Sequence, residues 1–194
     1  MRIIFLLLTG SLILVSAFLA AQTNWQFDKA HSKIQFTARH MKISQTSGQF
    51  NDYSGTIKAN NEDFTDAQIN LTIQAESVDT DNKKRDQHLR AEDFLHTEEY
   101  PEISFASESL RKVSENDYKL EGTLTIKGVS RTEVFDVKYM GTVEAMGATR
   151  AGFKVTGSID RFDYNVDWDR SFGQGLIVGR EIGINADVEL IKKE

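Results

Sequence analysis

The stretch AQINLTIQA, residues 67–75, decides the fold. Alanine, isoleucine and leucine occupy every second position of this stretch, and glutamine, asparagine and threonine occupy the positions between them. Successive side chains of a β-strand point to opposite faces, so the alternation gathers the apolar side chains on one face, whereas a helix would scatter them around its axis. The stretch is therefore predicted to form a strand with one face toward the interior.

Seven more segments show this alternation, some less regularly: residues 34–38, 50–57, 103–107, 118–127, 135–139, 153–160 and 182–190. One polar face and short connections favour antiparallel pairing, because a parallel sheet is buried on both faces and needs long crossovers. The sequence Lys-Gly-Val-Ser at 127–130 suits a hairpin turn. Eight such strands either stack as a sandwich or close on themselves, and closure removes the exposed edges. We therefore predict an all-β fold, an eight-stranded antiparallel up-and-down barrel.

Two connections, residues 77–101 and 161–180, are too long for simple turns. The first contains a segment without glycine or proline around residues 82–95, for which we predict a short helical insertion. The second is rich in aromatic residues and aspartate, which favours an ordered loop. Loops of this length in a compact domain are usually functional. We expect both to cover the mouth of the barrel.

Composition excludes several classes of protein. The chain has 194 residues, no cysteine, 23 basic residues and 29 acidic residues, and its net charge is −6. The absence of cysteine excludes a disulfide scaffold, a cysteine-ligated zinc or iron–sulfur site and a thiol nucleophile. The acidic balance, with no basic run longer than residues 83–85, argues against a nucleic-acid partner.

The first 21 residues form a separate segment. Arg2 precedes an apolar stretch that ends in Ala20-Ala21, which is the pattern of a secretory signal peptide. No linker or repeat follows it. We therefore expect residues 1–21 to be removed on export, which leaves one domain over residues 22–194 with no stable membrane insertion after cleavage. An uncleaved membrane anchor is the alternative.

Motifs that carry chemistry are scarce. Metal-ligand spacing is absent among the four histidines, His31, His40, His88 and His96. Asp86 and His88 could be taken for an acid–base pair, but residues two apart on a helix do not face each other. A structural role for Arg85 and Asp86, with hydrogen bonds to loop backbone or strand ends, is therefore preferred. We predict no metal, no cofactor and no catalytic residue.

Five stretches resemble the signature of the YceI-like family. In order along the chain they are DKAHSKIQF at 28–36 with His40, GQF at 48–50 with Gly55, RDQHLR at 85–90 with Asp93 and Phe94, YPEISF at 100–105, and GTLTIKGVSR at 122–131. The resemblance implies a lipocalin-like barrel whose internal tunnel binds a polyisoprenoid or a similar long-chain amphiphile. It also implies a periplasmic location and frequent dimerisation, and it brings no established catalytic residues.

Sixteen apolar side chains on the strand faces are the candidates for the wall of such a tunnel. If the barrel is hollow they face the ligand, and if it is solid they pack against each other as a core. They are Phe36, Phe50, Ile57, Ile69, Leu71, Ile73, Phe105, Leu124, Ile126, Phe135, Val137, Phe153, Val155, Ile159, Ile182 and Ile184. Gly55, Gly122 and Gly157 share the apolar phase and either leave space inside or allow the strands to bend.

Polar head-group contacts are expected at the mouth, where the candidates are His40, Arg85, Arg131, Arg161 and Trp168. Arginine suits a phosphate head because its guanidinium forks onto two oxygens. The leading hypothesis is a non-enzymatic protein that binds, transports or stores a polyisoprenoid, quinone or similar lipid, with a second copy of the chain as a possible partner. The alternatives are an enzyme that acts on such a lipid with Asp86 and His88, and a solid-core protein-interaction module.

Overall fold

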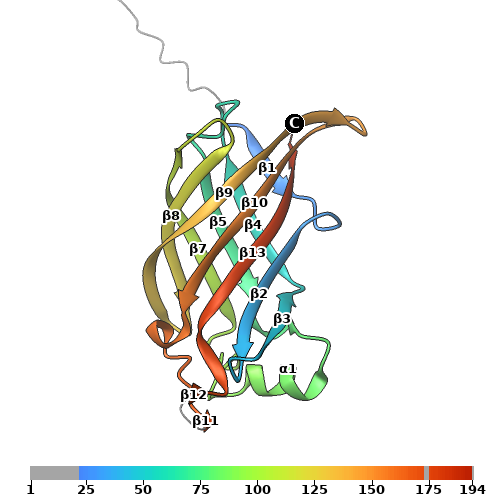
Figure 1. The fold of residues 1–194 in the computed structure, drawn as a ribbon. Coiled ribbons are helices and arrows are strands. Elements are labelled where there is room, and N and C mark those ends of the chain that lie inside the picture. Colours follow the sequence, from blue (N-terminus) through green and yellow to red (C-terminus); the bar gives the residue numbers. More distant parts are fainter. Residues whose placement is uncertain (1–21, 173–174, 194) are drawn as a thin grey trace, which may run out of the picture.

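In the computed structural model, which describes residues 22–172 and 175–193, the chain forms an antiparallel β-barrel with one α-helix at one end (Figure 1). The strands are β1 Asn24–Phe27, β2 Lys33–His40, β3 Ser44–Phe50, β4 Tyr53–Lys58, β5 Gln68–Gln74, β6 Val78–Asp79, β7 Glu102–Lys112, β8 Asp117–Ile126, β9 Val129–Ala145, β10 Ala148–Asp160, β11 Ser171–Phe172, β12 Gly175–Leu176 and β13 Val178–Lys192. The helical segments are α1 Lys83–Arg90 and the 3-10 turns η1 Ala75–Ser77 and η2 Arg161–Tyr164. The predicted signal peptide, residues 1–21, lies outside the described residues.

The closed wall has eight positions around the barrel, which we call staves. Each of the first three staves is formed by two consecutive strands, β1 with β2, β3 with β4, and β5 with β6, and each of the other five by one strand. Each stave pairs antiparallel with the next one along the chain. The last stave returns to the first, because β13 pairs with β2 and then with β1, where Trp25 lies opposite Lys192. This closure confirms the predicted eight-stranded up-and-down barrel and excludes the sandwich.

The structure also contains strand residues outside the predicted segments, in parts of the sequence where the alternation is weak. The sequence of β3, SQTSGQF, has no apolar alternation, and the irregular phase at residues 51–52 marks the break between β3 and β4. β9 and β10 continue past the barrel as a two-stranded ribbon (Figure 1), on which Met140, Val143 and Met146 are exposed. Because this ribbon has no buried face, its sequence has no reason to alternate.

The hairpin between β8 and β9 has the turn predicted from the sequence. Only Lys127 and Gly128 separate Ile126 from Val129, which lie opposite each other in the ladder. Both turn residues have positive φ values, 48° and 73°, as a two-residue type I′ turn requires. Glycine adopts this conformation without strain, so the turn sets the register in which β8 and β9 pair.

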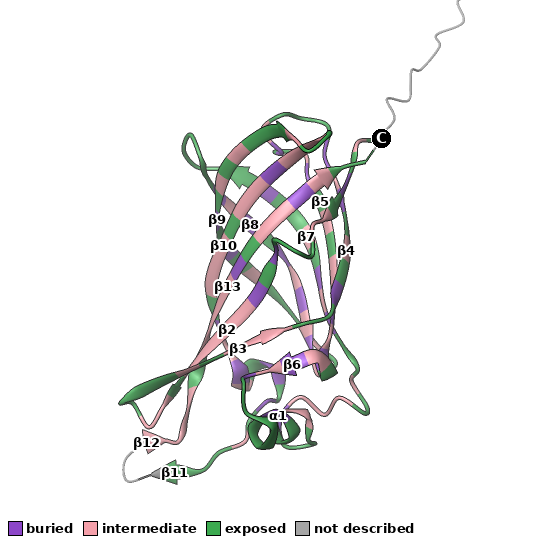
Figure 2. Cartoon of the chain, turned by 90° about the vertical axis from the view of Figure 1, so that its right-hand side faces the viewer, coloured by how far each residue is buried: buried purple, intermediate pink, exposed green. Residues whose placement is uncertain are grey.

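Helix α1 lies across one end of the barrel (Figure 2), within the insertion predicted at residues 82–95. The Asn82 side chain caps it by accepting a hydrogen bond from the Arg85 backbone N–H at 3.1 Å. Asp86 is the buried residue of the helix. Its Oδ1 accepts hydrogen bonds from the backbone N–H and the hydroxyl of Thr80, at 2.9 and 2.5 Å. These bonds tie α1 to the chain that follows β6.

No helix within the described part of the chain is long and apolar enough to span a bilayer.

Candidate functional site

The barrel encloses a cavity of about 290 Å³ that 36 residues line. All of them are alanine, valine, leucine, isoleucine or phenylalanine except Gln35, Arg161 and Tyr164. Such a wall offers a ligand dispersion contacts and removal from water, but few hydrogen-bond partners. The cavity therefore suits a hydrocarbon chain, and its presence argues against a solid core.

The cavity wall contains all sixteen residues that the strand pattern indicated as candidates. It also contains residues that alternation does not indicate, among them Phe64 from the β4–β5 connection, Leu89 from α1 and Phe94 from the segment after α1. A period of two carries no information about loop and helix residues. Their only signal in the sequence is the isolated apolar side chain within a polar segment.

The glycines on the apolar phase make room for aromatic rings of the wall. A Cβ atom at Gly122 would lie 2.5 Å from the Phe105 ring, and one at Gly157 would lie 2.6 Å from the Phe135 ring. Gly55 likewise faces a phenylalanine ring. At Gly55 and Gly122 a Cβ atom would also meet a backbone carbonyl oxygen of the neighbouring strand, that of Asn70 or Ala106. The glycines therefore allow close packing within the wall and do not add free volume for a ligand.

Aromatic side chains cover the cavity at the end opposite α1. The Phe64 ring is only 3% exposed, and its centroid lies 5.0 Å from that of Trp25, 4.9 Å from Phe153 and 5.8 Å from Tyr139. Phe64 has a φ of 58°, in the left-handed region that L-amino acids rarely adopt. The turn in this conformation aims the ring into the barrel.

At the α1 end the wall is not a complete hydrogen-bonded ladder. β5 pairs with β7 as far as Gln74 opposite Glu102, whereas β6 pairs only with β3 among the described strands. Here α1 and the residues after it line the cavity with Leu89, Phe94 and Leu95. This end is therefore covered by side chains, and it can open without loss of a strand pairing.

Of the five head-group candidates, only Arg161 lies in the cavity wall. Arg85 instead secures α1, because its Nε and Nη2 groups donate to the hydroxyl and carbonyl oxygens of Thr80, both at 2.7 Å. His40 ends β2 and pairs with Ser44 across the β2–β3 hairpin.

The remaining two candidates lie outside the wall. Arg131 donates from Nε to the Asp163 carbonyl oxygen at 3.3 Å. Trp168 packs against Phe94 with ring centroids 5.3 Å apart and against His88 at 5.5 Å. Because Phe94 lines the cavity, Trp168 supports a wall residue without being part of the wall.

Arg161 is 4% exposed and begins η2, which follows β10 and contacts β13. The end of β10 lies on the α1 side of the barrel (Figure 1). Its Nε, Nη1 and Nη2 groups donate to the backbone carbonyls of Gly179, Val166 and Val178, at 2.9, 2.5 and 3.0 Å. Burial lowers the pKa of this guanidinium below its ordinary value. Arginine nevertheless stays protonated in proteins, but no polar atom of the wall faces the cavity, so Arg161 borders the cavity with its carbon atoms.

The acid–base pair considered from the sequence, Asp86 with His88, does not form. Asp86 is occupied by Thr80, as the preferred structural role requires. His88 Nε2 instead lies 2.8 Å from Asp93 Oδ2, with both side chains nearly half exposed. Neither His88 nor Asp93 lines the cavity.

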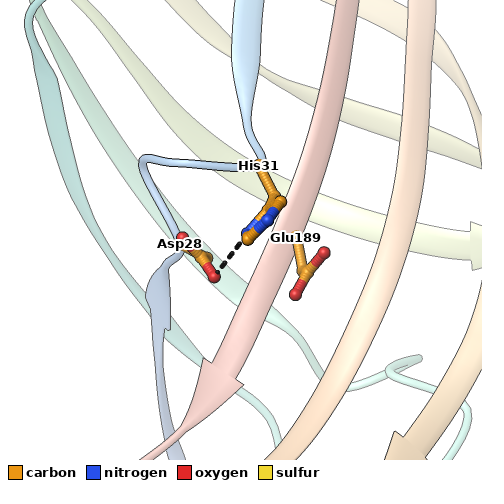
Figure 3. A group of neighbouring side chains, drawn as sticks. All are labelled: Asp28, His31 and Glu189. Carbon is orange, nitrogen blue, oxygen red and sulfur yellow. Dashed lines mark hydrogen bonds and ion pairs between the residues drawn. The ribbon is translucent and has the colours of Figure 1, made fainter. Parts of the chain in front are cut away.

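One group outside the cavity wall has the donor types of a metal site. Asp28, His31 and Glu189 place one ligand atom each within 4.8 Å of one another (Figure 3). However, Arg150 Nη1 lies 2.7 Å from Asp28 Oδ2 and 2.6 Å from Glu189 Oε1. Arg150 already supplies the positive charge that a metal ion would bring, so the group is an ion-pair network that ties the chain after β1 to β10 and β13.

This network shifts the pKa values of three of its members, Asp28, His31 and Arg150. The side-chain hydrogen bond between His31 Nδ1 and Asp28 Oδ2, 2.9 Å long, is the largest cause that lowers the pKa of Asp28 from 3.8 to about 2, and the bond to Arg150 adds to it. The same contact raises the pKa of His31 above its ordinary value of 6.5. The ionised forms of both residues are therefore favoured in the folded protein.

Comparison with known proteins places these features in a family. The family model described as YceI-like domain matches residues 25–190. UPF0312 proteins of two Staphylococcus aureus strains, N315 and Mu50, are 34% identical to the chain over 170 residues, which cover 86% of this chain and 96% of each relative.

Solved structures show the same barrel. The YCEI protein of Campylobacter jejuni is 31% identical and superposes with a TM-score of 0.69, covering 80% of this chain and 90% of that protein. BcnA of Burkholderia cenocepacia superposes with a TM-score of 0.71 at 24% identity, covering 84% and 98%. A polyisoprenoid binding domain from Saccharophagus degradans, implicated in plant cell wall breakdown, superposes with a TM-score of 0.66 at 13% identity, covering 87% and 98%. At such low identity the last two show a shared fold alone.

Proposed function

The chain belongs to the YceI-like domain family, and from this premise we propose that it binds a long-chain amphiphile, such as a polyisoprenoid or quinone, and carries or stores it without changing it chemically. The observation that supports the proposal is the hydrocarbon wall of the cavity, which runs from Phe64 at one end to Leu89 at the other. Each methylene group left in water costs about 0.8 kcal/mol. A lipid tail therefore needs such a sheath to cross an aqueous compartment.

A relative by fold fits this proposal. The Saccharophagus degradans domain is described as binding polyisoprenoids. Its low identity limits that comparison to the barrel, so the argument for this chain rests on its own wall residues.

The ligand is proposed to enter at the α1 end. Side chains of α1 and the segment after it cover that end, whereas the opposite end is closed by the Phe64 cluster. Displacing Leu89, Phe94 and Leu95 breaks no ladder pairing, because β6 and β7 are not paired in the described structure. A lipid-sized opening there costs less than an opening between bonded strands.

The first test analyses the ligand directly. The protein is purified from its native compartment, and an organic extract is examined by mass spectrometry. Stoichiometric long-chain lipid, recovered unchanged after incubation with the protein, is the expected result. Absence of lipid from repeated preparations, together with no uptake by the delipidated protein, would overturn the proposal.

A pair of variants tests whether the cavity is the binding site. Val155 lines the cavity, whereas Val134 on the neighbouring strand β9 is 52% exposed on the outside of the barrel. Val155→Trp places a bulky ring in the cavity and is expected to lower the amount of co-purified lipid severalfold. Val134→Trp makes the same chemical change outside and is expected to leave the lipid content unchanged. Equal lipid content in both variants would place binding elsewhere.

We also propose that residues 1–21 direct export to the periplasm, that they are cleaved after Ala21, and that the mature domain pairs with a second copy. The intact mass of the periplasmic protein tests the cleavage, because a protein that keeps residues 1–21 would contradict it. Light scattering after gel filtration tests the pairing, because a monomer mass at micromolar concentration would contradict it.

A further inference from the structure

The cavity suits a hydrocarbon tail and not a polar head group. Although Gln35, Arg161 and Tyr164 belong to the wall, none of their polar atoms faces the cavity. A head group inside would exchange its hydrogen bonds with water for contacts with carbon atoms, which is unfavourable. On the proposed route of entry, the head therefore stays in water at the α1 end and the tail points toward Phe64.

At the closed end the tail meets the ring of Phe64. This ring lines the cavity and is 3% exposed. Trp25 packs against it, with ring centroids 5.0 Å apart, and does not line the cavity. Tyr139 and Phe153 also contact the ring. A tail that reaches Phe64 can extend no further unless the ring moves.

The turn that carries Phe64 is held by hydrogen bonds. The Phe64 N–H donates to the Asn61 carbonyl oxygen at 3.0 Å, and the Ala67 N–H donates to the Phe64 carbonyl oxygen at 2.9 Å. The Asp66 carboxylate accepts from the backbone N–H groups of Asn60 and Asn61 at 2.9 and 3.0 Å. Moving the turn would break these bonds in addition to the ring contacts, so Phe64 is a fixed stop, in contrast to the side chains that cover the α1 end.

We propose that Phe64 sets the longest tail that the cavity can bury. The inference rests on the proposed function and adds a limit on the tail length of its ligand. Each methylene group that enters the cavity leaves water, which raises the affinity about fourfold. Once the tail reaches Phe64, a further methylene group stays in water at the α1 end and adds nothing. The protein then separates lipids by the length of the tail.

The test measures affinity against tail length. Delipidated wild-type protein is loaded with the fluorophore N-phenyl-1-naphthylamine, which straight-chain saturated fatty acids from octanoate to eicosanoate then displace at neutral pH, each below its critical micelle concentration. The affinity is expected to rise about fourfold with each added methylene group up to one tail length, which we call the break. Beyond the break it should stay constant.

Variants of the ring should move the break in opposite directions. Phe64→Ala lets the tail extend toward Trp25, so a fatty acid two methylene groups longer than the wild-type break should bind about tenfold more tightly than the one at that break. Phe64→Trp enlarges the ring and should place the break at a shorter tail. Phe162→Ala removes a ring that does not line the cavity and is expected to keep the wild-type break.

A wild-type affinity that rises through every tail length would overturn the proposal, as would an unchanged break in Phe64→Ala that circular dichroism shows to be folded. If Phe64→Ala does not fold, Phe64→Leu, with its smaller side chain, and Phe64→Trp decide by the direction in which each moves the break. Failure of every fatty acid to bind would instead refute the proposed function itself.

Discussion

Phe64 allows a sharp test of the structure, because replacing it with a small residue has two opposite effects on stability: the buried ring is lost and the strained backbone can relax. The ring is almost fully buried against Trp25, Tyr139 and Phe153. The backbone is in the left-handed region, with φ at 58°. We compare Phe64→Ala with Phe64→Gly, since both remove the ring and only glycine relaxes the backbone.

The expected changes in the free energy of unfolding follow from the loss of the ring and the relaxation of the backbone. Removing a buried phenylalanine side chain typically costs about 3–5 kcal/mol. Because Phe64 also borders the cavity, the ring lacks contacts on that side, and we expect Phe64→Ala to cost about 3 kcal/mol, the lower end of the range. The left-handed conformation costs an L-residue about 1–2 kcal/mol, and glycine loses about 0.5–1 kcal/mol more backbone entropy than alanine. The difference between these two ranges spans about 0–1.5 kcal/mol, so Phe64→Gly should be more stable than Phe64→Ala by about 0.7 kcal/mol.

Urea unfolding measures the stability of each variant relative to wild type and of the glycine variant relative to the alanine variant. The values are compared only if the m-values are equal. Phe105 is the matched control, since it is equally buried, lies in the middle of β7 and has no positive φ. There the ordinary order is expected, with Phe105→Ala more stable than Phe105→Gly. A glycine variant at Phe64 that is no more stable than the alanine variant, or the same order at both positions, would refute the reasoning.

Three further predictions concern polar contacts. His31→Gln is expected to destabilise the protein most below pH 6.5, because the Asp28 contact favours the charged imidazole. The loss of stability should shrink as the pH rises through the raised folded-state pKa of His31. Thermal unfolding of both proteins from about pH 5 to about pH 9 measures this loss, and a loss that does not change with pH would contradict the prediction. Asp86→Ala should leave Thr80 without its acceptor and cost about 1–3 kcal/mol, seen as faster hydrogen exchange in α1 and not in β8. Tyr164→Phe removes the 2.6 Å bond to Glu133 and should cost about 1–2 kcal/mol in urea unfolding, whereas an unchanged midpoint would show that this bond contributes nothing.

The barrel could be predicted from the sequence because its wall has one apolar face. Residues such as Ile69 and Ile184 follow period two, and every candidate chosen on that phase lines the cavity. The hairpin at residues 127–128 was predictable for a different reason, since glycine in a short polar break between strands is a local signal. Each of these signals is local, because it can be recognised within a few consecutive residues.

The features that the sequence did not reveal depend on contacts across the fold. β3 has polar side chains on both faces, so only its pairing with β2 makes it a strand. Arg161 could not be told apart from Arg85 or Arg131 by residue type. What separates Arg161 is that η2 folds against the start of β13, where three backbone carbonyls hold its side chain at the wall.

The seam between β1 and β13 has a consequence for how the chain folds. Trp25 pairs with Lys192, so the contact that completes the ring joins residues near opposite ends of the described chain. Long-range closure of this kind is slow, because its entropic cost precedes its gain. A growing chain cannot complete the ring before its final strand is made, and until then the apolar inner face stays accessible.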